Sequence, residues 1–303
     1  MELIRTQRRK WSWTDKRTLQ GNAVIEVAND LVDYWPLTLR QIYYRLVAAG
    51  HIENTRSKYK DLSKLIKHMR LSDWLPWEVL EDRGRHVTDK KGFTDHQEFL
   101  TEQVDGFLEG YSRCLVQDQP AYVELWYEKD ALARVFDDVV WPYCIRSVAC
   151  KGYQSITFLD SFRRRALEAQ KRGQIPVILY FGDCDPSGIQ MFQATQQTLR
   201  EEMNLANIQC KRIALTPEQV NLFNLPVDPG AVKLTDSRYK KYVSQYGHLA
   251  VELDALHPGK LIELAEQAIQ AEFDMTLFNE NKIIEKEERQ RLTQIKERLV
   301  ANL

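Results

Sequence analysis

The sequence predicts an α/β fold in which a small helical N-terminal domain precedes a larger domain with a largely parallel sheet. From about residue 121 onward, short apolar runs rich in Val, Ile and aromatic residues alternate with amphipathic stretches of helical length. This alternation is typical of buried parallel strands joined by helices. The region before it shows only helical periodicity and turn residues. At 303 residues the chain is long enough for two domains.

Three helices are expected in the N-terminal domain, over residues 21–34, 39–49 and 55–69. A short turn joins the second helix to the third, which is the pattern of a helix-turn-helix. Residues 74–85 contain aromatic and apolar positions that suit a wing and its return strand. A polar loop over residues 88–94 then marks the boundary between the two domains.

The second of these helices has one apolar face. Thr38 can cap its start, and Gly50 can end it. With about 100° of rotation per residue, the apolar positions place Tyr43 close to the centre of the buried face and turn Tyr44 outward. Arg40 lies one helical turn before Tyr44, so their two side chains can touch.

Basic residues gather in the N-terminal domain. Residues 1–85 contain 16 Lys and Arg against 11 Asp and Glu, whereas the other 218 residues contain 26 against 32. A lysine row on the third helix suits contact with a phosphate backbone. The candidate DNA-binding residues of this domain are Arg45, Arg56, Lys60, Lys64 and Lys67. The alternatives are a solvated charged face and an attraction between the two oppositely charged halves.

The second domain alternates strands and helices after a connecting helix over 95–113. Strands are expected at about 121–127, 143–149, 175–181, 208–214 and 248–253. Helices are expected at about 129–138, 154–171, 187–203, 258–273 and 277–299. The last helix is dense in Glu, Lys and Arg, and we interpret it as a solvated brace or a dimer contact.

Two of the strands end abruptly in acidic residues. Glu128 follows the first strand, and Asp183 and Asp185 follow the third. Ligands of open parallel sheets sit beyond the carboxyl ends of the strands, and carboxylates there suit Mg²⁺ with a phosphate. Turn and helix-capping chemistry is the alternative for the two aspartates. Glu252 and Asp254 end another strand, where they could enlarge the metal site, but a solvent contact is the preferred interpretation.

Composition argues against several other classes of protein. The five cysteines are an odd number without zinc or redox spacing, which indicates a reduced, cytoplasmic protein. No apolar run approaches the roughly 20 residues of a membrane helix, and the N-terminus lacks the apolar stretch of a signal peptide. Six scattered histidines make a histidine-built metal site unexpected.

Four motifs together resemble one family. They are Glu-Lys-Asp-Ala at 128–131, Asp-Pro-Ser-Gly at 185–188, Val-Glu-Leu-Asp-Ala-Leu at 251–256 and Leu-Arg-Gln-Ile-Tyr-Tyr-Arg at 39–45. In this combination and order the chain resembles the topoisomerase VI A subunit and Spo11, and most closely the short standalone "mini-A" proteins. The resemblance covers roughly residues 36–273.

The resemblance implies a winged-helix domain that carries a catalytic tyrosine and a Toprim metal-binding domain. The segments are then an N-terminal arm and helix at 1–35, the winged helix at 36–90, a connecting helix at 91–120, the Toprim domain at 121–275 and a C-terminal helix at 276–303.

The activity that the resemblance implies is Mg²⁺-dependent cleavage of double-stranded DNA by a type IIB topoisomerase-like enzyme. Tyr44 is then the nucleophile that forms a 5′-phosphotyrosyl link, with Arg40 assisting and Mg²⁺ held by Glu128, Asp183 and Asp185. The resemblance also implies a homodimer with two composite sites, in each of which the tyrosine of one subunit meets the metal of the other, so that both strands are broken. The protein would then be cytoplasmic and associated with the nucleoid DNA. Because the chain has no Gly-rich phosphate loop, ATP-driven strand passage would need a separate ATPase subunit.

Three points remain open on the sequence. Lys129 can contact a DNA phosphate or form an ion pair with Asp130 or another neighbour. A Toprim nuclease that uses metal-activated water, as in plasmid-defence nuclease subunits, is the second functional hypothesis. A DNA-binding protein without catalytic activity is the third.

Overall fold

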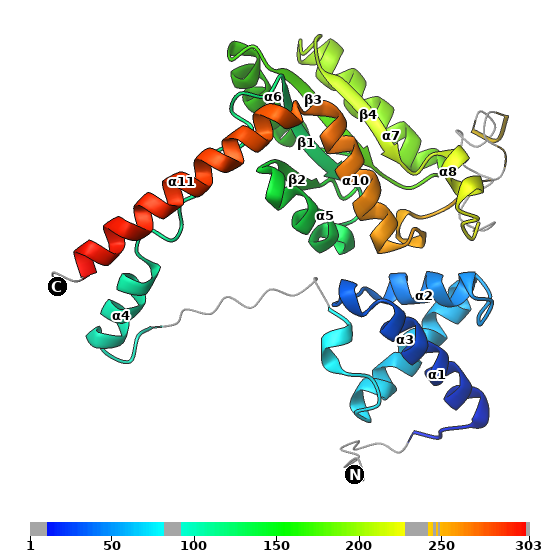
Figure 1. Ribbon diagram of the computed structural model, residues 1–303. Helices are drawn as coiled ribbons and strands as arrows, with labels where there is room; N and C mark the ends of the chain where they lie inside the picture. The colour runs from blue at the N-terminus through cyan, green and yellow to red at the C-terminus, as the bar shows by residue number, and fades with distance from the viewer. Residues whose placement is uncertain (1–10, 82–91, 228–241, 245–246, 248, 301–303) are drawn as a thin grey trace.

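The computed structural model describes residues 11–81, 92–227, 242–244, 247 and 249–300. Its core is an α/β domain with a four-stranded, all-parallel sheet in the order β2-β1-β3-β4 (Figure 1). The strands are β1 (Ala121–Tyr127), β2 (Arg146–Ala149), β3 (Ile175–Phe181) and β4 (Gln209–Ala214). The predictions of an α/β class and a parallel sheet are confirmed.

Helices cover both faces of the sheet, because the side chains of each strand alternate between two apolar clusters. Val123 and Leu125 of β1 face the cluster that includes α5 (Ala133–Val140) and α10 (Pro258–Glu272). Trp126 faces the second cluster, whose helical part comes mainly from α6 and also from α7. These two helices span Ile156–Lys171 and Pro186–Gln197. The sheet therefore lies between two helical layers, with its carboxyl ends free to form a site.

The prediction of a fifth strand at 248–253 is wrong, because the residues that the structure describes there do not form a strand. Val251 makes a single antiparallel bridge to Cys184, and the 3-10 helix η6 (Leu253–Ala255) follows. The backbone N–H of Leu253 donates to a carboxylate oxygen of Asp183 at 2.8 Å and not to a neighbouring strand. This carboxylate ends the pairing and fixes the segment beside the strand ends.

Three helices form the N-terminal region: α1 (Asp15–Asp30), α2 (Leu39–Ala48) and α3 (Arg56–Leu71). The first begins earlier than residue 21, because Thr14 caps it and Gly21 lies within it. A Cβ at Gly21 would come within 2.3 Å of the Trp74 ring, so glycine there permits close packing and does not mark a helix start. The other two helices agree with the prediction to within two residues, and Thr38 caps α2 as expected, in a capping box with Gln41.

The expected wing is only partly within the described residues. Trp77–Val79 forms a 3-10 helix, η2, and Leu80 makes a parallel bridge to Leu37. Residues 82–91, which include the predicted return of the wing and part of the boundary loop at 88–94, lie outside the described residues.

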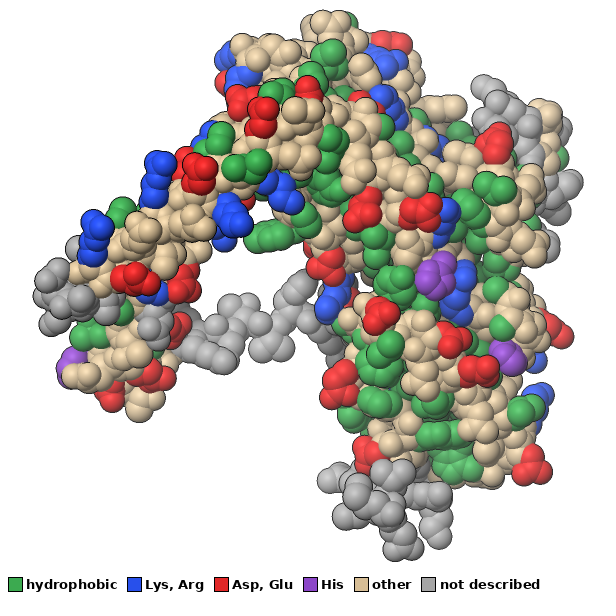
Figure 2. Space-filling view, in the orientation of Figure 1, with side chains coloured by type: hydrophobic (Ala, Val, Ile, Leu, Met, Phe, Trp, Pro, Cys, Tyr) green, Lys and Arg blue, Asp and Glu red, His purple; other side chains and the backbone are tan. Residues whose placement is uncertain are grey.

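A long C-terminal helix, α11 (Met275–Val300), runs away from the sheet (Figure 1), and its Lys296 pairs at 2.6 Å with Glu109, shortly after α4 (His96–Gly106). Basic and acidic side chains alternate along α11 in the space-filling view (Figure 2). Arg113 donates to Asn281 at 2.8 Å and to Glu288 at 3.0 Å. These contacts fit the interpretation of α11 as a brace for the connecting segment.

Short turns complete the described elements. They are η1 (Val32–Tyr34), η3 (Asp130–Leu132), η4 (Trp141–Tyr143), the π-helical turn η5 (Thr198–Glu202) and the helix α8 (Pro217–Leu222). Within the described residues, no helix combines the length and the apolar character needed to cross a membrane.

Candidate functional site

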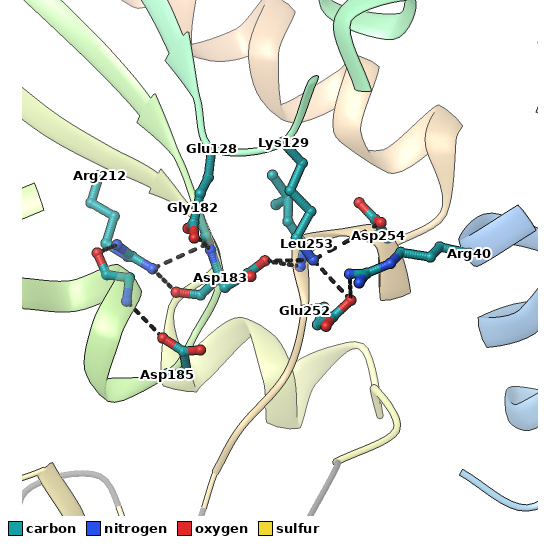
Figure 3. A network of polar contacts seen from close by, with 11 residues as sticks. Arg40, Glu128, Lys129, Gly182, Asp183, Asp185, Arg212, Glu252, Leu253 and Asp254 are labelled. Carbon is teal, nitrogen blue, oxygen red and sulfur yellow. Dashed lines mark hydrogen bonds and ion pairs between the residues drawn. The ribbon is translucent and has the colours of Figure 1, made fainter. Parts of the chain in front are cut away.

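The candidate site lies where α2 contacts the segment around η6. The Arg40 guanidinium pairs with the Glu252 carboxylate, and the Arg45 guanidinium donates to the Ala255 carbonyl oxygen. Figure 3 shows Arg40 reaching this segment from the N-terminal helices. Both arginines of the helix therefore hold the two parts of the chain together. For Arg45 this is a structural contact, and its DNA contact stays a prediction.

The orientation predicted for Tyr44 is wrong. Its side chain is only 6% exposed, nearly the same as the 4% of Tyr43. Tyr43 packs within its own region, where its hydroxyl lies 3.1 Å from both the Asn54 side-chain oxygen and the Thr55 carbonyl oxygen. Tyr44 does lie on another face of α2, but η6 covers that face. Helical periodicity could not reveal a partner more than 200 residues away in the sequence.

Burial and a nearby carboxylate keep Tyr44 in its neutral form. Desolvation raises the pKa of the Tyr44 hydroxyl, and the charge of Glu252 with a hydrogen bond to it raises this pKa further. The positive charge of Arg40 acts in the opposite direction but does not cancel these effects. The phenol therefore needs a proton acceptor before its oxygen can act as a strong nucleophile.

The pKa of the Glu252 carboxyl is shifted in the opposite direction, below its ordinary value. Burial acts to raise the pKa of its carboxyl, but the charges of Lys129 and Arg40 and hydrogen bonds from Lys129 and Tyr44 outweigh burial and lower this pKa. The Lys129 ammonium lies 2.9 Å from a Glu252 carboxylate oxygen. For Glu252, the sequence favoured a solvent contact over a place in the metal site, and its ion pairs with Arg40 and Lys129 were not predicted. The spacing of Glu252 and Asp254 after an apolar run was the available signal.

Lys129 is the centre of this cluster of charges (Figure 3). Besides Glu252, its ammonium lies 3.1 Å from Asp183 and 3.9 Å from Asp254. Of the two interpretations of Lys129, the structure shows the ion pair, although the partner is not Asp130. That aspartate pairs with Lys151 at 3.1 Å.

The three predicted metal ligands lie at the carboxyl ends of β1 and β3, as expected. Glu128 accepts a hydrogen bond from the backbone N–H of Asp183 at 3.0 Å. Asp185 caps α7 by accepting from the N–H of Gly188 at 2.6 Å, which was the alternative interpretation of this residue. Burial raises the pKa of Asp183 to about 7, and Lys129 only partly offsets this effect.

The chemistry of Glu128, Asp183 and Asp185 suits Mg²⁺, because all three side chains offer hard oxygen ligands. Burial raises the pKa of Glu128, and repulsion from Asp185 adds to this effect; a divalent cation would relieve this repulsion. Within the described ranges, however, no group of three or more His, Cys, Asp or Glu side chains is arranged to hold a metal ion. Magnesium binding therefore stays a prediction.

Arg212 of β4 supports the segment 182–188, which follows β3 and carries Asp183 and Asp185. This role of Arg212 was not predicted from the sequence. Its guanidinium donates to the backbone carbonyl oxygens of Gly182 at 3.1 Å and Gly188 at 3.2 Å, and also to that of Asp183. A Cβ at Gly188 would lie 2.4 Å from the Asp183 carbonyl oxygen, so glycine is needed for this close approach. A single arginine in a predicted strand was too weak a signal to identify this role.

A cavity of about 510 Å³ opens beside Tyr44. It is lined by Arg40, Tyr43, Tyr44, Asn54, Thr55, Arg56, Tyr59, Lys60 and Glu252. Two of the predicted DNA-binding residues, Arg56 and Lys60, thus share a cavity with Tyr44. Lys64 and Lys67 are exposed farther along α3 and do not line it.

No protein-family model, curated protein or solved structure matches this chain. The relation to topoisomerase VI A and Spo11 therefore continues to depend on the four sequence motifs. The geometry of the site provides a separate basis for a functional proposal.

Proposed function

We propose that this protein is a Mg²⁺-dependent DNA-cleaving enzyme of the topoisomerase VI A/Spo11 type, with a winged-helix domain followed by a Toprim domain. The supporting observation is the cavity that combines the Tyr44 hydroxyl, the Glu252 carboxylate and the cations Arg40, Arg56 and Lys60. A phosphodiester is an anion of a size that such a cavity can admit, and guanidinium groups bind phosphate oxygens well.

In the proposed reaction, the Tyr44 oxygen attacks a DNA phosphorus and displaces the 3′ oxygen of the neighbouring nucleotide. Arg40, Arg56 and Lys60 offset the negative charge that develops on the phosphate oxygens. Glu128, Asp183 and Asp185 would hold Mg²⁺, which supplies charge neutralisation and orients the strand. The Arg212 side chain keeps the segment 182–188 in place by donating to the backbone carbonyl oxygens of Gly182 and Gly188.

Two copies of the chain are proposed to act on the two strands of a duplex, so that a homodimer makes a double-strand break. Tyr44 is 6% exposed, so the strand has to reach it through the cavity. Within the same chain, Arg40 and Glu252 line this cavity with Tyr44. Full strand passage would require a separate ATPase subunit.

The test is a cleavage assay on supercoiled plasmid with Mg²⁺, stopped with denaturant and followed by protease digestion. We expect linear DNA whose 5′ ends carry covalently bound protein before digestion and a residual peptide after it, and no product in EDTA. Tyr44→Phe should abolish the adduct. Tyr43→Phe is the matched control, because it removes a neighbouring hydroxyl that does not face Glu252, and it should retain the adduct.

A metal-dependent nuclease that uses water is the second candidate. The observation in its favour is the burial of Tyr44, together with the raised pKa of its hydroxyl. Cleavage that persists in Tyr44→Phe, with protein-free ends, would establish this candidate and reject the covalent mechanism.

A further inference from the structure

We propose that the Lys129 ammonium fills a second cation position beside the proposed Mg²⁺ site, so that the unchanged protein binds one divalent ion and not two. This position lies among the carboxylates of Asp183, Glu252 and Asp254, which come from two separate segments of the chain. The proposal rests on the Mg²⁺ ion of the proposed function and adds how many ions the site takes and which side chain sets that number.

Lys129 is placed as a bound cation would be. Its ammonium nitrogen lies 2.9 Å from Glu252, 3.1 Å from Asp183 and 3.9 Å from Asp254 (Figure 3). Only 15% of its side chain is exposed. An ammonium group surrounded by carboxylates keeps its proton at neutral pH. Lys129 therefore supplies a fixed positive charge at the point where three carboxylates meet.

Asp254 is the residue that points most directly to a cation position. Its side chain is 0% exposed, and neither of its carboxylate oxygens has a hydrogen-bond partner among the described residues. A buried carboxylate without hydrogen bonds is costly unless a cation offsets its charge. The Lys129 ammonium is too far from Asp254 for a hydrogen bond. Lys129 thus compensates Asp254 only in part, and a divalent ion in this position would compensate it more fully.

Asp183 connects the second position to the proposed Mg²⁺ site. The Leu253 N–H at 2.8 Å and the Lys129 ammonium at 3.1 Å both contact the same oxygen of Asp183, Oδ1. Its other oxygen, Oδ2, can therefore serve the Mg²⁺ ion together with Glu128, which binds the Asp183 backbone N–H at 3.0 Å. Two cations can lie side by side in this way in two-metal sites. Here the second cation belongs to the protein itself.

The ammonium has to leave before a divalent ion can enter the second position. With Lys129 present, the part of the chain that the structure describes contains no group of three acidic side chains arranged to hold a metal ion. The three carboxylates are instead arranged around a nitrogen atom that carries a single charge. Replacement of Lys129 by a small neutral side chain is therefore the change that tests the proposal.

The number of bound divalent ions tests the proposal without a cleavage assay. Mn²⁺ is the probe, because it prefers the same oxygen ligands as Mg²⁺ and its free form is measured by electron paramagnetic resonance. We expect one Mn²⁺ per chain in the unchanged protein and two in Lys129→Ala. Lys151→Ala is the matched control, because it removes an exposed lysine whose partner, Asp130, lies outside this cluster. It should bind one Mn²⁺.

Double variants assign each ion to its position. Asp254→Asn in the Lys129→Ala background should remove the second Mn²⁺ and keep the first. Asp185→Asn in the same background should weaken the first and keep the second. A second Mn²⁺ that survives Asp254→Asn would lie elsewhere on the protein and would overturn the proposal.

Thermal unfolding provides an independent measurement. Without the ammonium, the three carboxylates lack their shared cation, so the thermal midpoint of Lys129→Ala in EDTA should fall by about 4 °C or more. Mn²⁺ should restore most of this loss, because the ion binds the folded state. Lys129→Ser, whose hydroxyl can hold water in the vacated space, serves if the alanine variant does not fold. If neither variant folds in Mn²⁺, a divalent ion cannot replace the ammonium and the proposal fails.

The remaining outcomes separate this proposal from the proposed function. One Mn²⁺ in both the unchanged protein and Lys129→Ala overturns the role of Lys129 and leaves the proposed function standing. Two Mn²⁺ in the unchanged protein overturn that role as well. No Mn²⁺ in the unchanged protein contradicts the proposed Mg²⁺ site. A single ion gained in Lys129→Ala and lost again with Asp254→Asn would then still support the cation position of Lys129.

Discussion

Two pairs of a glutamate and an arginine in this molecule differ in their burial and in what surrounds them. Glu124 is fully buried in the middle of β1 and is bound by the Arg165 guanidinium at 2.6 and 3.1 Å. The Tyr122 hydroxyl and the Trp126 indole N–H complete its contacts at 2.5 and 3.0 Å. All of these groups belong to one rigid unit of sheet and helix, so the pair is built for stability.

Glu252 has cationic partners as well, but they come from separate parts of the chain. Arg40 belongs to α2, Lys129 follows β1, and the cavity beside Tyr44 leaves one side of the carboxylate open to a ligand. Its side chain is 31% exposed, compared with 0% for Glu124. The acceptor of the second pair therefore reaches an open cavity beside Tyr44, whereas the acceptor of the first pair is enclosed by its own hydrogen-bond donors.

The largest effect on stability is expected at the first pair. Glu124→Ala leaves the buried donors of Arg165, Tyr122 and Trp126 without their acceptor, which should lower the free energy of unfolding by about 3–5 kcal/mol. Urea denaturation followed by circular dichroism measures this loss. Glu168→Ala, on the exposed side of α6, is the control. A loss below about 1 kcal/mol at Glu124 would contradict its structural role.

The second prediction concerns Asp183, which shares Lys129 with Glu252. Because its pKa is raised to about 7 in the folded protein, the native state binds more protons than the unfolded state between about pH 4 and pH 7. The free energy of unfolding should therefore fall as the pH rises through this window, by on the order of 2 kcal/mol.

Asp183→Asn should remove this slope, as seen in urea midpoints measured in EDTA at pH 5 and pH 7.5. Asp138→Asn, at an exposed position, serves as the control. A slope that is unchanged in Asp183→Asn would assign the pH dependence to another group.

A smaller loss of stability is expected at the pair of Arg40 and Glu252. Glu252→Ala should lower the free energy of unfolding by about 1 kcal/mol, because Glu252 and Arg40 are partly exposed and solvent screens their attraction. The difference between the variant and the unchanged protein should shrink in 1 M NaCl. A loss as large as that of Glu124→Ala would mean that the two pairs are equivalent, and the comparison would fail.

The smallest effect is expected for Tyr122→Phe. It removes one of the donors to Glu124 and leaves Arg165 and Trp126 in place, so the loss should be about 0.5–1 kcal/mol. Thermal unfolding measures this loss, and the proposed DNA cleavage should be unchanged because Tyr122 lies far along β1 from Glu128. A change in the cleavage rate would link the first pair to catalysis.

Much of the fold could be predicted from short-range patterns. β1 and β3 begin and end at the residues expected, because an apolar run bounded by turn or acidic residues is a local signal. Glu128, Asp183 and Asp185 were expected at the strand ends for the same reason. The strand expected at 248–253 failed because Val251 and Leu253 are held by Cys184 and by the Asp183 carboxylate, neither of which is visible from local periodicity.

The sequence by itself determined the parallel α/β class, the helix that carries Tyr43 and Tyr44, and the acidic residues that end two strands. These features follow from periodicity and capping, which act over a few residues. Only the tertiary structure decided that Tyr44 is buried and that Arg56 and Lys60 line the cavity beside it. The same is true of the ion pairs that Lys129 forms with Glu252 and Asp183. The physical reason is that burial and electrostatic pairing depend on which distant segment covers a helix face, and here η6 covers the face that carries Tyr44.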